Sequence, residues 1–443
     1  MLDMTKGSPM RSILAFSIPV LIGNVLNQVY SITDSIIVGR VLGMDALAAV
    51  GCTMPIVLLM AAVMIGVNAG VSILLSQARG SGDEVLMRRY FANSLYLGLL
   101  VALFMAVVGT AVSEPVLRLL GTPEGPFADA LTYIRVCFVT AVCPLFYYLL
   151  SCAYRGMGDS RTDLYFLIIS VVANIFLDYL FVAVYGWGVG GSAWATALAQ
   201  MLSVICSATV LFIKYPQIRF RKGDLRPDRI MFGKIIRLAI PIALQTAFNN
   251  LGNIVAQGVV NAFGSVVMAA YTAAGRVGSF ALMPLETVGN TLSVYTGQNY
   301  GAKQAERIHE GRRTALKLQL IISVVLALVL VLFGRGIAGW FLEVPSEEML
   351  RISYSYLLIT AVPGILAGIM LVYQQVMRGI GKSKESMYSG FVQLGVKIAV
   401  ILLGFYAVRT PVAIWVAWPV SFAAAAIVAV WIYRKRGTIT FQD

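Results

Sequence analysis

The chain has 443 residues, of which 59% are hydrophobic and only 12% charged, and its mean hydropathy is +0.81. Soluble domains carry about 25% charged residues, so a chain this poor in charge cannot cover itself with water-compatible side chains, and a soluble fold is excluded. The net charge of +13 would suit a nucleic-acid partner, but its distribution follows a membrane topology instead, and no nucleic acid is expected to bind.

About a dozen apolar stretches are long enough to cross a bilayer, which takes roughly 20 helical residues. In chain order, the expected spans are 12–38, 45–77, 90–112, 127–152, 162–184, 189–213, 236–262, 266–299, 314–334, 349–376, 386–408 and 411–433. They leave little chain for a water-soluble domain. The predicted fold class is therefore an all-α integral membrane protein with twelve transmembrane helices.

The first span is expected to be retained, because it is too long and too polar for the core of a cleaved signal peptide. Polar side chains recur in it at spacings of three and four, which places them on one face of the helix. They are Asn24, Asn27, Gln28, Ser31, Asp34 and Ser35. Pro19 precedes this face and removes a backbone hydrogen bond, so it is a predicted hinge.

Basic residues concentrate in alternate loops. One side of the expected topology holds Lys6, Arg79, Arg155, the basic residues of 214–234 and those of the tail 434–436. The other side holds only Arg40, Arg118, Arg335 and Arg409. Because cytoplasmic loops are enriched in Lys and Arg, both termini are predicted to be cytoplasmic.

The two halves of the chain repeat each other. The run 17–21 (SIPVL) corresponds to 239–243 (AIPIA), and 155–160 (RGMGDS) corresponds to 378–383 (RGIGKS). A polar, basic stretch with two prolines separates the halves. We predict an N-terminal lobe of six helices over 1–213, a basic cytoplasmic linker over 214–235 and a C-terminal lobe of six helices over 236–443, as parallel repeats.

Signatures of enzymes and cofactors are missing from the sequence. It has no P-loop and no H-E-x-x-H pattern, a single histidine (His309), and five cysteines without a C-x-x-C pair. The glycines of 155–158 and 378–381 are interpreted as helix-ending turns rather than a phosphate loop. We expect no enzyme activity and no cofactor. Without an ATP site, uphill transport would need an ion gradient.

Few ionisable residues lie at membrane depth, where they mark function by default. They are Asp34, Asp178, Arg276, Glu286 and Lys397. Asn174 and Asp178 are four residues apart in the fifth span and share a face, and Thr196 lies one turn inside the sixth. If these spans meet the first, Asp34, Asn174, Asp178 and Thr196 form an oxygen cluster for Na⁺, for a proton, or for each in turn.

The second half does not duplicate this cluster, since Lys397 stands where Asn174 would map and Ile401 where Asp178 would. The coupling ion is therefore expected in the first half alone. For Glu286 we favour pairing with Arg276 or Lys397 over contact with a cationic substrate. The candidate substrate cavity comprises Asn27, Gln28, Asn249, Asn253, Met283 and Glu286.

These motifs together resemble the multidrug and toxic compound extrusion (MATE) transporters. The resemblance rests on Ile18-Pro19 followed by Asp34, on Gln77 with Gly80, on the turn at Arg155 and on the pair Asn174/Asp178. It implies two six-helix lobes around a central cavity, and a first-lobe cation site at Asp34, Asn174, Asp178 and Thr196. One departure is that the seventh span has no acidic residue, whereas some branches of the family place a glutamate there.

The function that the resemblance implies is export of amphipathic, often cationic, compounds in exchange for Na⁺ or H⁺. A lipid-linked saccharide flippase of the same superfamily is the alternative, which Arg276 and Lys397 keep open. The expected partners are small-molecule drugs, the coupling cation and the lipid bilayer. The expected location is the plasma (inner) membrane of a prokaryote, with the protein as a monomer.

Overall fold

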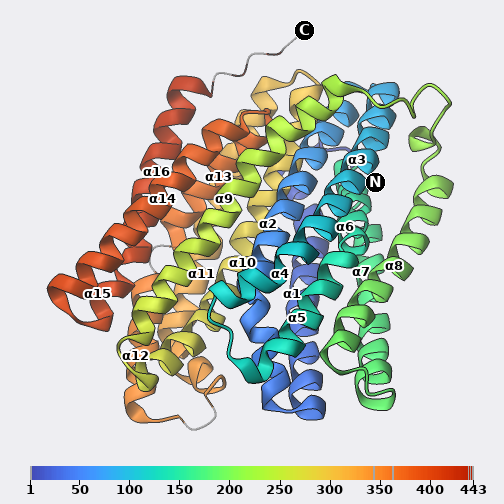
Figure 1. Cartoon of the computed structure of the whole chain (residues 1–443). Helices are drawn as coiled ribbons and strands as arrows, with labels where there is room; N and C mark the ends of the chain where they lie inside the picture. The colour runs from blue at the N-terminus through green and yellow to red at the C-terminus, as the bar shows by residue number, and fades with distance from the viewer. Residues whose placement is uncertain (1, 343–344, 362–363, 438, 440, 442–443) are drawn as a thin grey trace. The chain divides into compact units, whose positions relative to one another are not determined.

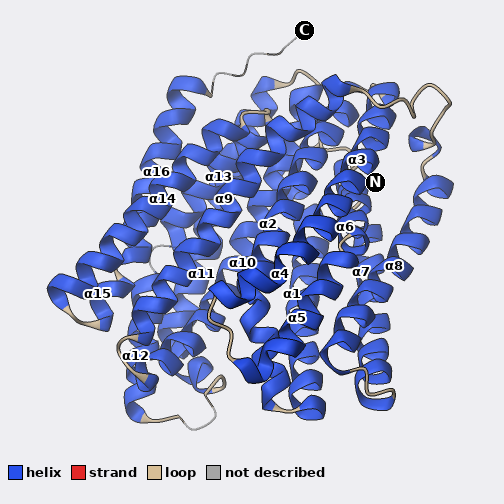
Figure 2. Ribbon diagram, in the orientation of Figure 1, coloured by secondary structure: helices blue, strands red, loops and turns tan. Residues whose placement is uncertain are grey.

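The computed structural model describes the whole chain except residues 1, 343–344, 362–363, 438, 440 and 442–443. Every regular element in the described part is a helix (Figure 2). By their contacts, the residues form two compact units. Unit 1 contains Ile18–Ala243, and unit 2 contains Asp3–Ser17 and Leu244–Asp443. These boundaries differ from the predicted lobe boundaries, because they fall inside helices rather than in the basic linker.

The helices of unit 1 are labelled in Figure 1, and the longest connection between them is the stretch 215–228 before α9. They are most of α1 (Pro9–Leu42), then α2 (Met44–Ser81), α3 (Glu84–Phe104), α4 (Thr110–Leu119), α5 (Glu124–Val139), α6 (Val142–Gly156), α7 (Ser160–Asp178), α8 (Gly188–Lys214) and the beginning of α9 (Arg229–Asn261). Two π-helical segments, Met105–Gly109 and Tyr179–Val184, extend α3 and α7.

Unit 2 contains the first turns of α1, the remainder of α9 and the later helices. These are α10 (Ser265–Gly301), α11 (Ala305–Gly339), α12 (Glu347–Ala361), α13 (Gly364–Gly379), α14 (Ser383–Leu403), α15 (Pro411–Trp415) and α16 (Ala417–Arg436). A π-helical segment, Gly404–Val408, extends α14. Two helices, α1 and α9, therefore begin in one unit and end in the other, and both contain an internal proline.

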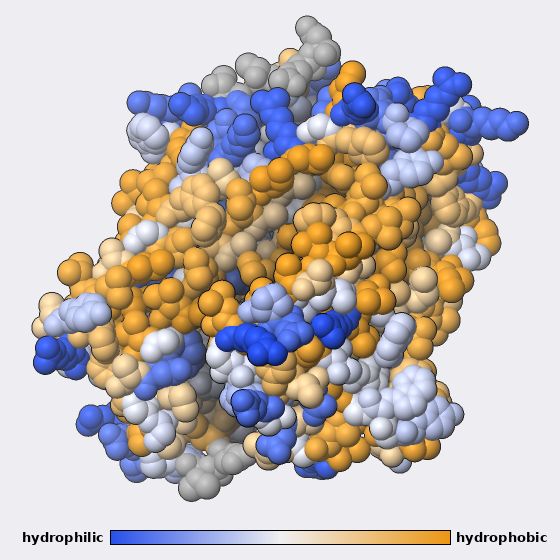
Figure 3. Space-filling view, viewed as in Figure 1, coloured by the Kyte–Doolittle hydropathy of each residue, from blue (hydrophilic) through white to orange (hydrophobic). Residues whose placement is uncertain are grey.

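The predicted number of membrane spans is confirmed. Within the described residues, ten helices are long and apolar enough to cross a membrane, and the number is twelve when each of two bent helix pairs counts as one span. Hydrophobic side chains cover the middle of the helices on the face that Figure 3 shows, and hydrophilic ones gather at the helix ends. The chain is thus a multi-pass membrane protein.

The expected continuous helix over 127–152 is wrong in one respect, because it breaks between α5 and α6 with a bend of 45°. Pro144 lacks the N–H that would bond to the carbonyl of Thr140, and its ring crowds that carbonyl. The amide of Cys143 bonds to Thr140 instead, at 2.9 Å, which tightens the turn. The other bent pair, α12 and α13, meets at residues outside the described part.

The glycine motifs at 155–158 and 378–381 end helices, as predicted. Gly158 and Gly381 have φ of 84° and 83°, in the left-handed region that favours glycine. The amide of Asp159 bonds to the carbonyl of Tyr154, and that of Lys382 to the carbonyl of Met377. These bonds satisfy carbonyls at the ends of α6 and α13 in the Schellman arrangement.

Small residues let helices approach closely inside unit 1. A Cβ placed on Gly66 of α2 would lie 2.5 Å from the Cβ of Ala243 and 2.7 Å from the carbonyl oxygen of Ala239. One placed on Gly70 would lie 3.1 Å from the carbonyl oxygen of Ile235. The small-xxx-small pair Gly66 and Gly70 therefore lets α2 pack closely on the beginning of α9.

Candidate functional site

Three helices of unit 1 each contribute two polar side chains to one cluster. Each pair is spaced four residues apart, so both members lie on the same face of their helix. The pairs are Tyr30 and Asp34 on α1, Asn174 and Asp178 on α7, and Ser192 and Thr196 on α8. We call these six residues the oxygen cluster.

Hydrogen bonds connect the three helices through the oxygen cluster. Ser192 Oγ donates to Asp34 Oδ1 at 2.7 Å, and this bond joins α8 to α1. Tyr30 Oη and Thr196 Oγ1 lie 2.9 Å apart and share a second bond between the same helices. Asn174 Nδ2 donates to Thr196 Oγ1 at 3.2 Å and joins α7 to α8. Side-chain oxygens from three helices are therefore held within one network.

Part of the cluster is buried without hydrogen-bond donors. Asp178 is 1% exposed and Asn174 is 2% exposed. Among the residues that the structure describes, none donates a hydrogen bond to either carboxylate oxygen of Asp178 or to Oδ1 of Asn174. The carboxyl groups of Asp34 and Asp178 are close enough to act on each other electrostatically. A buried carboxylate is costly unless a proton or a cation compensates its charge.

The backbone changes its geometry directly after Asp178. This residue is the last of α7, and the π-helical segment Tyr179–Val184 follows it. π-Helical turns are frequent at functional sites because the wider turn re-aims side chains and carbonyls. The segment therefore fits a functional position at the end of α7.

A second polar cluster fixes the beginning of α7, outside the membrane-spanning segments. Asp159 caps the helix by accepting hydrogen bonds from the amide and hydroxyl of Thr162, and it also binds Lys214 at 2.9 Å and the hydroxyl of Tyr215. Burial alone would raise the pKa of Asp159, but these hydrogen bonds outweigh it and lower the pKa to about 2. The charged form of Asp159 thus helps to place the helix that carries Asn174 and Asp178.

All four predicted cation-site residues, Asp34, Asn174, Asp178 and Thr196, come together in this cluster, but their role stays a prediction. Tyr30 and Ser192 were not predicted. Each lies four residues before a predicted member, Tyr30 before Asp34 and Ser192 before Thr196. That spacing was the signal that could have found them.

The candidate substrate-cavity residues lie in both units. In unit 1, Asn27 is exposed and Gln28 half-buried on α1. In unit 2, Asn249, Asn253 and Glu286 are exposed and Met283 is half-buried. Of these four, Asn253 lines a pocket inside unit 2. Whether the six residues contact a substrate stays a prediction.

The favoured pairing of Glu286 with Arg276 or Lys397 is wrong. Among the described residues, Glu286 forms no ion pair, and it is exposed on α10. Lys397 instead donates a hydrogen bond to Asn253 Oδ1 at 2.6 Å. The hydrogen-bond acceptor of Lys397 is therefore the neutral amide oxygen of Asn253 and not the carboxylate of Glu286.

Pro19 lies inside α1, one residue after the first residue that α1 contributes to unit 1. Its missing N–H leaves the carbonyl of Ala15 without a helical partner. Just before it, Ser17 Oγ donates to Thr291 Oγ1 at 2.9 Å within unit 2. The proline thus stands where the helix passes from one unit to the other, and its hinge role stays a prediction.

Both halves of the chain match the same protein family. The sequence model of the family described as MatE matches residues 19–180 and again 241–403, which together make up more than half of the chain. The matches begin at Pro19 and Pro241, so they follow the register of the internal repeat.

Similar proteins cover nearly the full chain. "Probable multidrug resistance protein YoeA" of Bacillus subtilis (strain 168) is 30% identical over 439 residues, which is 97% of this chain and 94% of the relative. A protein named "FAD transporter" from Shewanella oneidensis is 26% identical and covers 85% of this chain and 84% of its own. A structure described as the "Outward-facing conformation of a multidrug resistance MATE family transporter of the MOP superfamily" has a TM-score of 0.91 at 23% identity, over 98% of each chain, so it shares the fold.

Proposed function

Because the chain belongs to the MatE family of multidrug and toxic compound extrusion transporters, we propose that it exports amphipathic compounds in exchange for a monovalent cation, Na⁺ or H⁺. We place this activity in the plasma membrane of a bacterium, where such a cation gradient is available. The coupling cation binds at the oxygen cluster of unit 1.

The observation that carries the proposal is the set of buried oxygens without donors. Two of them belong to Asp178 and one to Asn174. An acceptor buried without a donor costs about 1–3 kcal/mol, and more when it is charged. A proton on Asp178 removes the negative charge of its carboxylate. A Na⁺ ion compensates that charge, and all three oxygens can coordinate the ion. Either cation therefore stabilises the observed arrangement of the buried oxygens.

The remaining residues hold this set in place. Ser192 orients the carboxyl group of Asp34, and Asn174 bonds to Thr196 through its amide nitrogen, which leaves Oδ1 of Asn174 free to coordinate. Two ionised carboxyl groups at this distance repel each other, so binding one positive charge at the cluster is favourable. The cluster can therefore bind and release a single cation as the conditions around it change.

Coupling requires that the cation favour one conformation over another, since a ligand shifts an equilibrium only by its differential affinity. Pro19 stands between the part of α1 in unit 2 and the part that carries Asp34. We propose that cation binding changes the bend of α1 at Pro19 and so drives release of the exported compound. Reversal of this change would release the cation when the next compound is loaded.

The substrate proposal follows the names of the relatives, among which multidrug resistance proteins recur. The test is efflux of a fluorescent lipophilic cation from proteoliposomes, with Na⁺ and H⁺ gradients imposed separately. Efflux that follows one gradient supports the proposal and identifies the ion. Absence of gradient-driven efflux for every cation tested contradicts it, and a measurement of lipid-linked saccharide flipping would then decide for the alternative.

A further inference from the structure

Lys397 is a buried cation that the oxygen cluster of unit 1 does not use. It lies on α14, is 5% exposed and donates a hydrogen bond to Asn253 Oδ1. Its Nζ also lies 4.4 Å from the ring centroid of Trp418. No carboxylate in the described part of the chain forms an ion pair with it. Ionisable residues at membrane depth are costly and mark function by default, so this lysine requires an explanation.

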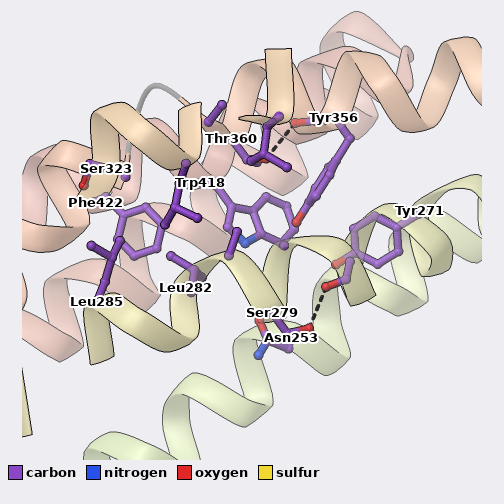
Figure 4. Close-up of a pocket in the computed structure, with 17 residues that line it drawn as sticks. Asn253, Tyr271, Ser279, Leu282, Leu285, Ser323, Tyr356, Thr360, Trp418 and Phe422 are labelled. Carbon is purple, nitrogen blue, oxygen red and sulfur yellow. Dashed lines mark hydrogen bonds between the residues drawn. The ribbon is translucent and has the colours of Figure 1, made fainter. Parts of the chain in front are cut away.

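Both partners of Lys397 line a cavity of about 240 Å³ inside unit 2 (Figure 4). Helices α9 to α13 and α16 contribute its walls. Three aromatic rings form much of one side, with Trp418 centred 5.6 Å from Tyr356 and 6.0 Å from Tyr271. Pockets of this kind, mostly apolar with a few polar groups, are the usual sites of small ligands.

A polar group inside the cavity has no partner. Ser323 of α11 lines it, is 1% exposed, and its Oγ forms no hydrogen bond with any described residue. Two other lining residues with hydroxyl groups, Ser279 and Thr360, donate to carbonyls of their own helices. Because a buried hydroxyl is normally bonded, Ser323 indicates a ligand or water with a polar atom at this point.

The charge of the cavity is one-sided. None of the described residues that line it is acidic, whereas the ammonium of Lys397 contacts two of them. Lysine has three N–H donors, and the hydrogen bond to Asn253 uses one. The remaining donors of Lys397 suit an acceptor with negative charge, and the rings suit an aromatic body. Ser323 lies beside Leu285 and Phe422, away from Asn253 (Figure 4), so its free hydroxyl suits a second polar atom of the ligand.

We propose that this cavity of unit 2 binds an amphipathic aromatic anion, such as an aromatic carboxylate, with the charge stabilised by Lys397, the rings packed on Trp418 and Tyr356, and a second polar atom of the ligand bonded to Ser323. The site is separate from the oxygen cluster, since all its residues belong to unit 2. The inference rests on the proposed export of amphipathic compounds and adds that some of these compounds carry a negative charge.

The test compares three probes of one shape and different charge: naphthoate, naphthylmethanol and naphthylmethylammonium. Their binding is measured by equilibrium dialysis against the full protein in nanodiscs of neutral lipid, without any ion gradient. We expect the wild type to prefer naphthoate. Lys397→Met should weaken naphthoate binding about 10- to 100-fold, as expected for a hydrogen bond to a charged group, and leave naphthylmethanol binding unchanged.

Two further variants keep the test decisive. Ser323→Ala breaks no existing hydrogen bond, so it should fold normally. It should leave naphthoate binding unchanged and weaken the binding of a naphthoate with a hydroxyl group on its second ring. Lys317→Met, on the exposed face of α11, is the matched control and should change nothing. Equal binding of all three probes, or naphthoate binding unchanged in Lys397→Met, would overturn the proposal. The binding assay uses no ion gradient, so its outcome is distinguishable from that of the gradient-driven efflux assay.

Discussion

Ser192 on α8 donates a 2.7 Å hydrogen bond to Oδ1 of Asp34 on α1. The bond fixes the carboxyl group on the side of the cluster that faces α8. A hydrogen bond to a charged group contributes about 1.5–3 kcal/mol, which corresponds to about tenfold or more in affinity. Ser192→Ala should therefore raise the ion concentration that gives half-maximal efflux by about tenfold.

The control for this prediction is Ser203→Ala on the same helix. Ser203 is fully buried but bonds to the carbonyl of Phe166 rather than to the cluster. Its removal should change stability and leave the ion dependence of efflux unchanged. Equal ion dependence in Ser192→Ala and wild type would contradict the assigned role of Ser192.

The hinge proposal predicts that Pro19→Ala separates ion binding from transport. Alanine restores the backbone donor to the carbonyl of Ala15, so the helix should straighten. Binding of the coupling ion, measured by dialysis, should stay near the wild-type level, whereas gradient-driven efflux should fall. Pro55→Ala, in an α2 that lies wholly in unit 1, serves as the control. Wild-type efflux in Pro19→Ala would show that no hinge is needed there.

The close approach of α2 and α9 predicts opposite effects for two glycines of the same helix. Gly66→Ala would place a methyl group 2.7 Å from the carbonyl oxygen of Ala239, and it should cost about 1–3 kcal/mol of stability. Gly51→Ala meets no atom within 4 Å and should stabilise the helix by about 0.5–1 kcal/mol. Thermal unfolding in detergent checks both, and a neutral Gly66→Ala would contradict the packing.

The lowered pKa of Asp159 predicts that its contribution to the free energy of unfolding depends on pH. Its pKa is lowered from the ordinary 3.8 to about 2, so its charged form is favoured in the folded state. The resulting stabilisation, about 2 kcal/mol, is therefore complete above the ordinary pKa and is lost as the pH falls toward about 2. Asp159→Asn should be less stable than wild type at neutral pH, and the difference should shrink below about pH 4.

Thermal unfolding between about pH 3 and pH 7 measures this difference. Asp83→Asn is the matched control, because Asp83 also caps a helix, α3, but is exposed, and among the described residues its carboxylate accepts a hydrogen bond from the amide of Leu86 alone. It should cost less than Asp159→Asn. A difference between wild type and Asp159→Asn that does not depend on pH would contradict the assigned cause.

The sequence allowed four of the six cluster residues to be predicted, because Asp34 and Asp178 are costly in a membrane and the spacing of Asn174 to Asp178 places both on one face. It did not point to Tyr30 or Ser192. Tyrosine and serine are common in membrane helices, where serine also bonds to its own backbone, so their presence alone carries no signal.

The other differences between the predictions and the structure concern contacts between residues far apart in the sequence and a break in a predicted helix. Glu286 and Lys397 have opposite charges, which suggested a pair, but the partner of Lys397 is the neutral Asn253 from α9. The break before Pro144 could have been predicted from the proline, although prolines often leave membrane helices continuous, as Pro55 does in α2. The register of the repeat, by contrast, was readable because equivalent motifs recur at one shift.

The most direct test of the account is gradient-driven efflux by Asp178→Asn in proteoliposomes, beside the wild type and Asp129→Asn. Asp129 is an exposed aspartate of α5 and serves as the matched control. We predict that Asp178→Asn loses efflux driven by the coupling-ion gradient while still binding the exported compound, and that Asp129→Asn behaves as wild type. Undiminished, gradient-dependent efflux by Asp178→Asn would contradict the claim that the oxygen cluster of unit 1 couples the cation to export.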